Sequence, residues 1–142
     1  MGIVVDSTII IEIERTGRER PEELLHTLPD ESFLASITVS EVLVGAHLAD
    51  TDSRRSGRLA LIDAAVSRCP VIPFGESEAR VHAQLRVELR QQGIAVGSAD
   101  LLIAATTMAD AHALLTRNVA EFQRVPGLRV LMLDQHGKSV EP

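Results

Sequence analysis

Short runs of consecutive apolar residues alternate along this chain with longer segments whose apolar positions have helical spacing. The first run, residues 3–5, ends at an acidic residue, and an all-apolar run is typical of a strand that is buried on both faces. We expect further strands at residues 33–37, 71–73, 113–116 and 129–133. Because strands that alternate with helices are joined by crossover connections, the pattern predicts an α/β fold with a mainly parallel central sheet of about five strands flanked by helices.

The segments between these runs supply the predicted helices. Gly93 and Gly97 flank a turn, Ser98 is placed to cap the apolar helix that follows, and the polar tract 51–58 is expected to be a loop. The expected helical ranges are 7–13, 21–28, 38–50, 59–68, 76–92, 99–109 and 118–124.

A chain of 142 residues is long enough for one domain with a single core. We expect that domain over residues 1–134 and a flexible tail over residues 135–142. The single cysteine, Cys69, excludes an internal disulfide and a cysteine-based zinc cluster. No basic leader precedes the first apolar run, and the uncharged stretch 101–109 is too short to span a bilayer. The expectation is a reduced cytoplasmic protein that does not associate with a membrane.

Acidic or amide side chains stand where expected strands give way to helices. They are Asp6, Glu41, Asp100 and Asn118, with Glu121 one turn later. The carboxyl ends of parallel strands share one edge of the sheet, where such folds bind ligands. Carboxylates gathered there would line a pocket for a hard divalent cation. The pattern therefore indicates a metal-dependent enzyme that acts on phosphates.

Each of these side chains also has a structural explanation. Thr38 and Glu41 fit a capping box, and Asn118 begins a second pattern of the same kind. Asp100 would meet the positive end of its helix, and Asp6 would cap the first one. Several carboxylates in one place repel each other unless a cation offsets their charge. Spacing alone leaves both explanations open.

The motifs also occur in the order of a known family, over nearly the whole chain. They are VVDST at 4–8, SITVSEVLVG at 36–45, GSADLLIAA at 97–105, LLTRN at 114–118 with EF at 121–122, and VPGL at 125–128. With these segments the chain resembles the PIN-domain ribonucleases, specifically the VapC-type toxins of bacterial toxin–antitoxin pairs.

By position, the resemblance implies that Asp6, Glu41 and Asp100 are the acidic trio that binds Mg²⁺, for which Mn²⁺ can substitute. Asp6 and Asp100 would be the principal ligands. The fourth family position is often Asp and is Asn118 here, which leaves open whether Glu121 completes the acidic set or contributes only through water. Thr116 would sit beside the metal and orient a ligand or water.

The activity that the resemblance implies is hydrolysis of phosphodiester bonds in structured cellular RNA by an endoribonuclease. A cognate antitoxin of the VapB type would silence it by occupying the active-site groove, and the toxin would be a homodimer. The alternative is a catalytically weak or inactive PIN-like binding module, which the asparagine at position 118 keeps open. A phosphatase built on Asp6 is disfavoured because Thr8 takes the place of the second acid in an Asp-x-Asp pair.

The net charge of −6 argues weakly against a sequence-independent nucleic-acid binder. The basic residues are thirteen arginines and one lysine, and arginine can hold phosphate in a bidentate manner. Arg86 and Arg90 are one helical turn apart and would form a phosphate-binding ridge, although Glu88 nearby suggests an ordinary charged face. Arg117 could likewise contact phosphate or remain a solvated surface residue.

Overall fold

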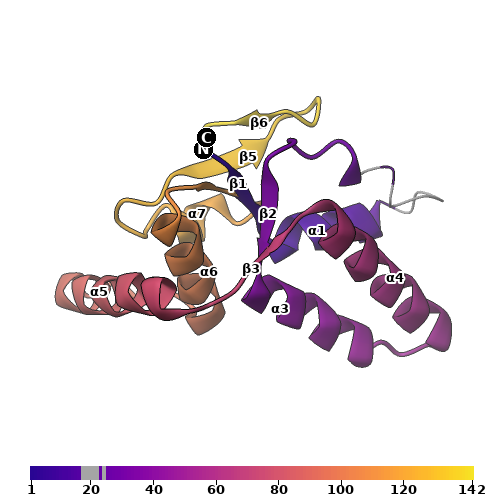
Figure 1. Ribbon diagram of the computed structural model, residues 1–142, viewed down its shortest axis with the longest axis horizontal. Helices are drawn as coiled ribbons and strands as arrows, with labels where there is room; N and C mark the ends of the chain where they lie inside the picture. The colour runs from indigo at the N-terminus through magenta and orange to yellow at the C-terminus, as the bar shows by residue number, and fades with distance from the viewer. Residues whose placement is uncertain (17–22, 24) are drawn as a thin grey trace.

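The computed structural model describes residues 1–16, 23 and 25–142, in which helices and strands alternate (Figure 1). Residues 21, 22 and 24 of the predicted helix at residues 21–28 lie outside the described residues, and residues 26–28 form a turn and a bend rather than helix. The elements are β1 (Ile3–Val5), α1 (Ser7–Arg15), β2 (Ser32–Ala35), α3 (Ser36–His47), α4 (Asp52–Arg68), β3 (Val71–Ile72), α5 (Glu76–Gln92), α6 (Ser98–Ala109), β4 (Ala113–Leu115), α7 (Val119–Phe122), β5 (Val130–Leu133) and β6 (Ser139–Val140).

The strands form a sheet in the order β3-β2-β1-β4-β5-β6. The pairs β3–β2, β2–β1, β1–β4 and β4–β5 are parallel, and β6 is antiparallel to β5. The prediction of a mainly parallel α/β fold is therefore confirmed. The chain builds outward from β1 to β3 and then returns to the other side of β1 with β4. This reversal makes the edge between β1 and β4 a topological switch point, where open α/β sheets bind their ligands.

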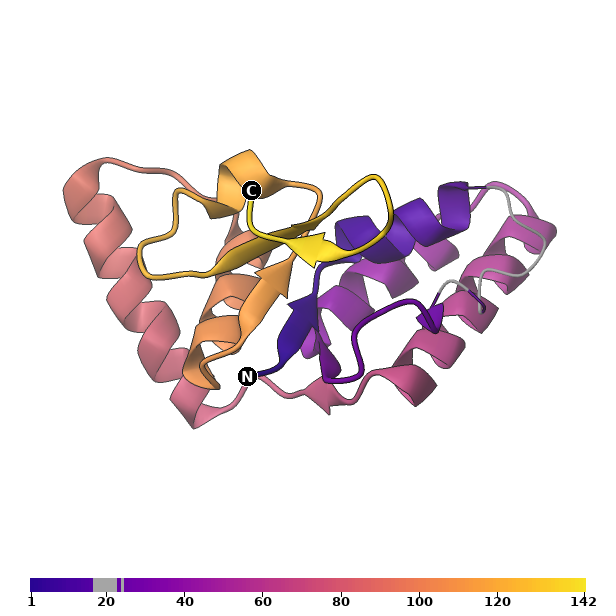
Figure 2. The same cartoon turned by 90° about the horizontal axis from the view of Figure 1, so that it is seen from above.

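Both faces of the sheet are covered by helices, as the all-apolar strands predicted. Figures 1 and 2 show α1, α3 and α4 on one side of the sheet, and α5 and α6 on the other. Adjacent strand residues point to opposite faces. One core cluster accordingly includes Val5, Leu115 and Leu131 with Ile10 and Ile62 from the helices, whereas the other includes Val4, Leu114 and Val130 with Ile103 and Phe122.

Helices α5 and α6 form an antiparallel pair with a small core of their own. Leu85 and Leu89 of α5 pack in one cluster with Leu101 of α6 and with Val125. Gly93 ends α5 in the left-handed region, at φ 69°, a conformation that glycine adopts without steric strain. The chain can therefore reverse direction within residues 93–97 and start α6 alongside α5.

The predicted loop at residues 51–58 is wrong, because α4 begins at Asp52. The hydroxyl of Thr51 accepts a hydrogen bond from the backbone N–H of Arg54 at 3.1 Å and caps the helix. Arg54 also pairs with Asp50 at 3.0 Å, and Arg55 pairs with Asp52 at 3.0 Å. This first part of α4 is exposed, so it lacks the apolar periodicity on which the prediction depended.

Two helices begin earlier than predicted. Helix α3 begins at Ser36 directly after β2, so Ile37 is helical rather than the end of a strand. Helix α6 begins at Ser98, with Gly97 as its N-cap and no side-chain cap. The other element ends differ from the predicted ranges by a few residues, as is usual for helix and strand boundaries. No helix in the described part of the chain has the length and apolar character needed to cross a bilayer.

The sequence predicted no secondary structure after Asp134, whereas Ser139 and Val140 form β6. The turn that precedes this strand explains the difference. Asp134 Oδ1 accepts hydrogen bonds from the backbone N–H groups of His136 and Lys138, each at 2.8 Å. Gly137, at φ 76°, completes the reversal. The short strand therefore depends on its turn and on its partner β5 rather than on an apolar run of its own.

Candidate active site

Asp6 lies at the switch point of the sheet. It follows β1 directly, and its backbone N–H donates to the carbonyl of Leu115, the last residue of β4, at 2.9 Å. Its side chain is only 2% exposed. Thr116, which follows β4, is fully buried beside it. The carboxyl ends of β1 and β4, which are more than 100 residues apart in the sequence, thus bring these two side chains together.

Two threonine hydroxyls hold one oxygen of the Asp6 carboxylate. Thr8 and Thr116 each donate to Asp6 Oδ2 at 2.7 Å. Each hydroxyl also accepts from a backbone N–H, Thr8 from Arg117 at 3.0 Å and Thr116 from Asn118 at 2.9 Å. A hydroxyl has a single proton to donate, so these amides leave both protons directed at Asp6. The other carboxylate oxygen, Oδ1, is buried and has no hydrogen-bond partner among the described residues.

Two further carboxylates, Glu41 and Asp100, belong to the same cluster. Glu41 lies in the second turn of α3, and Asp100 lies in the first turn of α6. Burial, followed by the negative charges of Asp6 and Asp100, raises the pKa of Glu41 above its ordinary value of 4.5. Burial and the charges of Asp6 and Glu121 raise the pKa of Asp100. The side chains are therefore close enough to repel one another.

Glu121 belongs to this cluster, since its charge is one of those that raise the pKa of Asp100. Glu121 Oε1 accepts from the backbone N–H of Gly97 at 3.4 Å, and its Oε2 pairs with Arg124 at 3.2 Å. Gly97 lies close to the cluster too, since a Cβ added there would be 3.4 Å from Asp100 Oδ2. The side chain of Asn118 is exposed and makes no cap hydrogen bond. Of the two residues proposed for the fourth acidic position, the structure brings Glu121 to the other acids.

The capping explanation fails for three of these positions. Asp6 and Asn118 are the N-cap residues of α1 and α7, and neither side chain makes a cap hydrogen bond. Because α3 begins at Ser36, Thr38 and Glu41 lie inside the helix and form no capping box. The dipole argument still holds for Asp100, which lies in the first turn of α6. Helix capping therefore does not explain why the Asp6 side chain and the Oε1 atom of Glu41 are buried.

The donor set fits a hard divalent cation. Asp6 Oδ1 and Glu41 Oε1 are both buried without a hydrogen-bond partner within the described part of the chain, which is costly for a charged oxygen. Among the described residues, no three His, Cys, Asp or Glu side chains are already arranged to enclose an ion. Mg²⁺, however, is usually held by one or two carboxylates and keeps several water molecules. An ion at these two oxygens would provide the missing partner and offset the repulsion.

Arg117 is not free to bind phosphate. Its guanidinium forms an ion pair with Glu12 of α1 through two hydrogen bonds, and it also donates to the carbonyl of Leu133 at 3.1 Å. The structure therefore supports the structural explanation of this arginine. The contacts tie the segment after β4 to α1, the two elements that provide Thr116 and Thr8.

Thr8 is a site residue that the sequence did not predict. The only sequence signal is its place two residues after Asp6, where a threonine disfavours an Asp-x-Asp pair. Its contacts with Thr116 and Arg117 join positions 108 and 109 residues apart. Such contacts have no local sequence pattern, so only the folded chain reveals the role of Thr8 in holding Asp6.

Comparison with known proteins identifies the class to which this fold and site belong. The family model of the PIN domain matches residues 3–128. The chain therefore belongs to the PIN-domain family, and the resemblance noted from its motifs is confirmed.

Similar proteins within this family are the VapC ribonucleases. The chain is 34% identical to ribonuclease VapC1 of Rickettsia felis over 131 residues, which cover 92% of this chain and 96% of the relative. It is 33% identical to the tRNA(fMet)-specific endonuclease VapC of Salmonella typhimurium, with the same coverage. The crystal structure of VapBC2 from R. felis bound to a promoter DNA fragment superimposes with a TM-score of 0.80 and 26% identity, over 94% of this chain and 100% of the matched chain.

Proposed function

We propose that this protein is a VapC-type toxin: an endoribonuclease that hydrolyses phosphodiester bonds with a Mg²⁺ or Mn²⁺ ion held by Asp6, Asp100 and Glu41. The observation that carries the proposal is the pair of buried carboxylate oxygens without partners, Asp6 Oδ1 and Glu41 Oε1, at the switch point of the sheet. Membership of the PIN-domain family and the similarity to VapC ribonucleases support it.

The chemistry requires a scissile phosphodiester to be brought to a cluster of negative charges. When bound, a divalent cation supplies Lewis-acid activation of the phosphate and compensates charge on the leaving oxygen. The protein's own part is positioning. Thr8 and Thr116 fix Asp6 through one oxygen and leave the other for the ion. Glu121 and Asp100 extend the acidic surface from α7 and α6, where their charges raise the affinity for the cation.

A cognate antitoxin is the second part of the proposal. Solved structures of related chains include VapBC from Salmonella typhimurium bound to DNA and VapBC-5 from Mycobacterium tuberculosis, described as a member of the VapBC family of toxin–antitoxin systems. We expect this chain to be neutralised by an antitoxin of the VapB type and to be a homodimer. Co-expression of the neighbouring reading frames, followed by measurement of the mass of the purified complex, tests both expectations.

The decisive experiment is cleavage of total cellular RNA, and of tRNA(fMet) as a defined substrate, by the purified protein in Mg²⁺, Mn²⁺ or EDTA. We expect discrete metal-dependent cuts that disappear in Asp6→Asn and Asp100→Asn. The matched control is Asp63→Asn, an exposed carboxylate on α4 outside the site. Cuts that persist in EDTA would contradict the role of the metal, and cuts that persist in both site variants would contradict the assigned ligands.

Metal binding can be measured separately from activity. An ion that binds only the folded protein stabilises it by about 2.7 kcal/mol at a concentration 100 times its Kd. We therefore expect Mn²⁺ to raise the melting temperature of the wild type and of Asp63→Asn, but not that of Asp6→Asn. A binding module that holds no metal would show no shift in any of them and no cleavage.

A further inference from the structure

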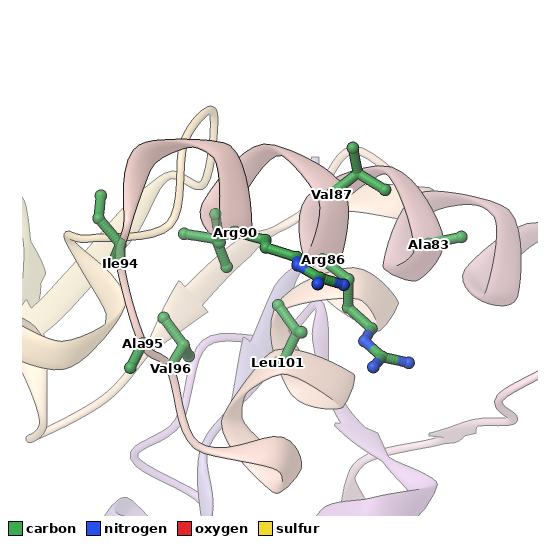
Figure 3. A pocket seen from close by; sticks show the side chains of 9 residues that line it. Ala83, Arg86, Val87, Arg90, Ile94, Ala95, Val96 and Leu101 are labelled. Atoms are coloured by element: carbon green, nitrogen blue, oxygen red, sulfur yellow. The ribbon is translucent and has the colours of Figure 1, made fainter.

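An apolar hollow of about 550 Å³ lies between α5, the segment 94–96 that returns from it, and the start of α6. Its walls include Val87, Val96 and Leu101. Two arginines on successive turns of α5, Arg86 and Arg90, also line it. Figure 3 shows the Arg90 side chain extending above Leu101, and the Arg86 side chain projecting from α5 beside it. The two charged side chains that line this hollow are therefore both positively charged.

These two arginines differ from most others in the described part of the chain because they have no anionic partner there. The majority of the arginines in the described part of the chain are ion-paired, among them Arg80 with Glu76 on the same helix. Among the described residues, Arg86 and Arg90 form no ion pair or hydrogen bond, a property that they share only with Arg15. Glu88 forms no ion pair with either arginine among the described residues, and it lines a neighbouring hollow that shares Ala83 and Val87 with this one.

Two unpaired guanidinium groups one turn apart repel each other, and the apolar walls around them strengthen that interaction by lowering the local dielectric constant. An anion bound between the two guanidinium groups would be attracted to both of them and would offset their repulsion. Guanidinium is also the group best suited to hold a phosphate through two parallel hydrogen bonds. The hollow is thus suited to a ligand that carries phosphates and has apolar or aromatic parts as well.

The position of Arg86 connects this hollow with the candidate active site. Arg86 also lines an adjoining hollow with Ser98 and Leu102, in the first two turns of α6. Asp100 lies in the same first turn of that helix. A strand of nucleic acid that leaves the acidic cluster across the start of α6 would therefore reach Arg86 and then Arg90.

We propose that Arg86 and Arg90 bind backbone phosphates of the RNA substrate on the α5 side of the acidic cluster. The proposal rests on the proposed ribonuclease activity and names the residues that attract the polyanion to a protein of net charge −6. The acidic cluster repels RNA until its metal is bound, so binding energy must come from cations outside it. Phosphate contacts position RNA without selecting its sequence, so these arginines serve affinity rather than choice of cleavage site.

The test compares the double variant Arg86→Gln/Arg90→Gln with the single variants and with Arg80→Gln, which removes a charge from the same helix but from an existing ion pair. Binding of a 5′-labelled RNA is measured by fluorescence anisotropy in EDTA, and cleavage is measured in Mn²⁺. We expect each of the two arginines to contribute on the order of tenfold in affinity. The salt dependence of log K should fall by about 0.7 per arginine, the value for a single strand.

In the cleavage assay we expect the double variant to raise KM and to leave kcat and the cleavage sites unchanged. Arg80→Gln should behave as wild type, and Arg86→Lys/Arg90→Lys should recover part of the affinity. Equal effects of the double variant and Arg80→Gln would overturn the proposal while leaving the nuclease intact. A wild type that neither binds nor cleaves RNA would overturn the proposed function and this inference together. A change in native mass only in the double variant would assign the hollow to a second copy of the chain instead.

Discussion

Replacing Thr116 by valine tests whether the hydrogen bond from the Thr116 hydroxyl to the Asp6 carboxylate is needed for the site. Valine has nearly the same shape as threonine, so the fully buried position stays filled. The variant loses the 2.7 Å hydrogen bond to Asp6 Oδ2 and the 2.9 Å bond from the backbone N–H of Asn118. The other donor to Asp6, Thr8, remains.

The magnitude follows from these contacts. A hydrogen bond to a charged group contributes about 1.5–3 kcal/mol. Because Thr8 still donates to the same oxygen, we expect the lower part of that range, about 2 kcal/mol. For a chain of this length the melting temperature should fall by about 5–8 °C. The freed carboxylate should lower metal affinity or activity by about 10- to 100-fold, as is usual when a residue that orients a ligand is removed.

The assay pairs thermal unfolding, with and without Mn²⁺, with RNA cleavage. The matched control is Thr107→Val, since Thr107 is equally buried but donates to the carbonyl of Ile103 within α6 at 2.8 Å. That intrahelical bond contributes little to helix stability, so the control should unfold near wild type and keep its activity. If Thr116→Val matched the control in both measurements, the Thr116 hydroxyl would have no role in holding Asp6.

Three further outcomes are expected. Glu41→Gln should stabilise the metal-free protein at pH 7, because burial and the charges of Asp6 and Asp100 raise the pKa of Glu41, and should remove the Mn²⁺ shift of the melting temperature. Because the raised pKa makes ionisation oppose folding, stability is lost as pH rises from 4.5 through the folded value, so the gain should nearly vanish in a melting series extended to pH 4. Cys69 is buried, and burial raises the pKa of its thiol, so a chromogenic disulfide reagent should label it only as the protein unfolds; rapid labelling of the native state would contradict this. Glu12→Gln should lower stability by less than about 1 kcal/mol in thermal melts, because its ion pair with arginine is partly exposed, and a larger loss would show that the pair holds the site together.

The fold was predictable because strands buried on both faces have a distinctive composition. Every predicted strand was found, and the parallel order followed from the intervening helices. The start of α4 was missed because exposed polar residues form a helix there through the Thr51 cap and local ion pairs. The strand β6 was missed because its stability comes from pairing with β5 through the Asp134 turn. Both elements depend on contacts that an apolar pattern does not encode.

The site was predictable to a similar degree. The positions of Asp6, Glu41 and Asp100 after strands or at the start of helices, together with the family motifs, indicated the acids that the structure brings together. The positions of these acids in the sequence do not show that Glu121 lies near them, since that depends on how α7 is turned toward Gly97. The role of Thr8 depends on a contact with the far end of the chain, which one sequence does not reveal.

The pairing of β1 with β4 determines at which stage of synthesis and folding this site can form. Ile3 pairs with Ala113, and the Asp6 carboxylate is held by a residue 110 positions later. A chain still emerging from the ribosome has Asp6 and Glu41 exposed long before β4 is synthesised, and closing so long a loop is a late event in folding. The two ends of the active site therefore meet only when almost the whole polypeptide is complete, so a nascent or prematurely terminated chain has no assembled cluster with which to cut the RNA around it.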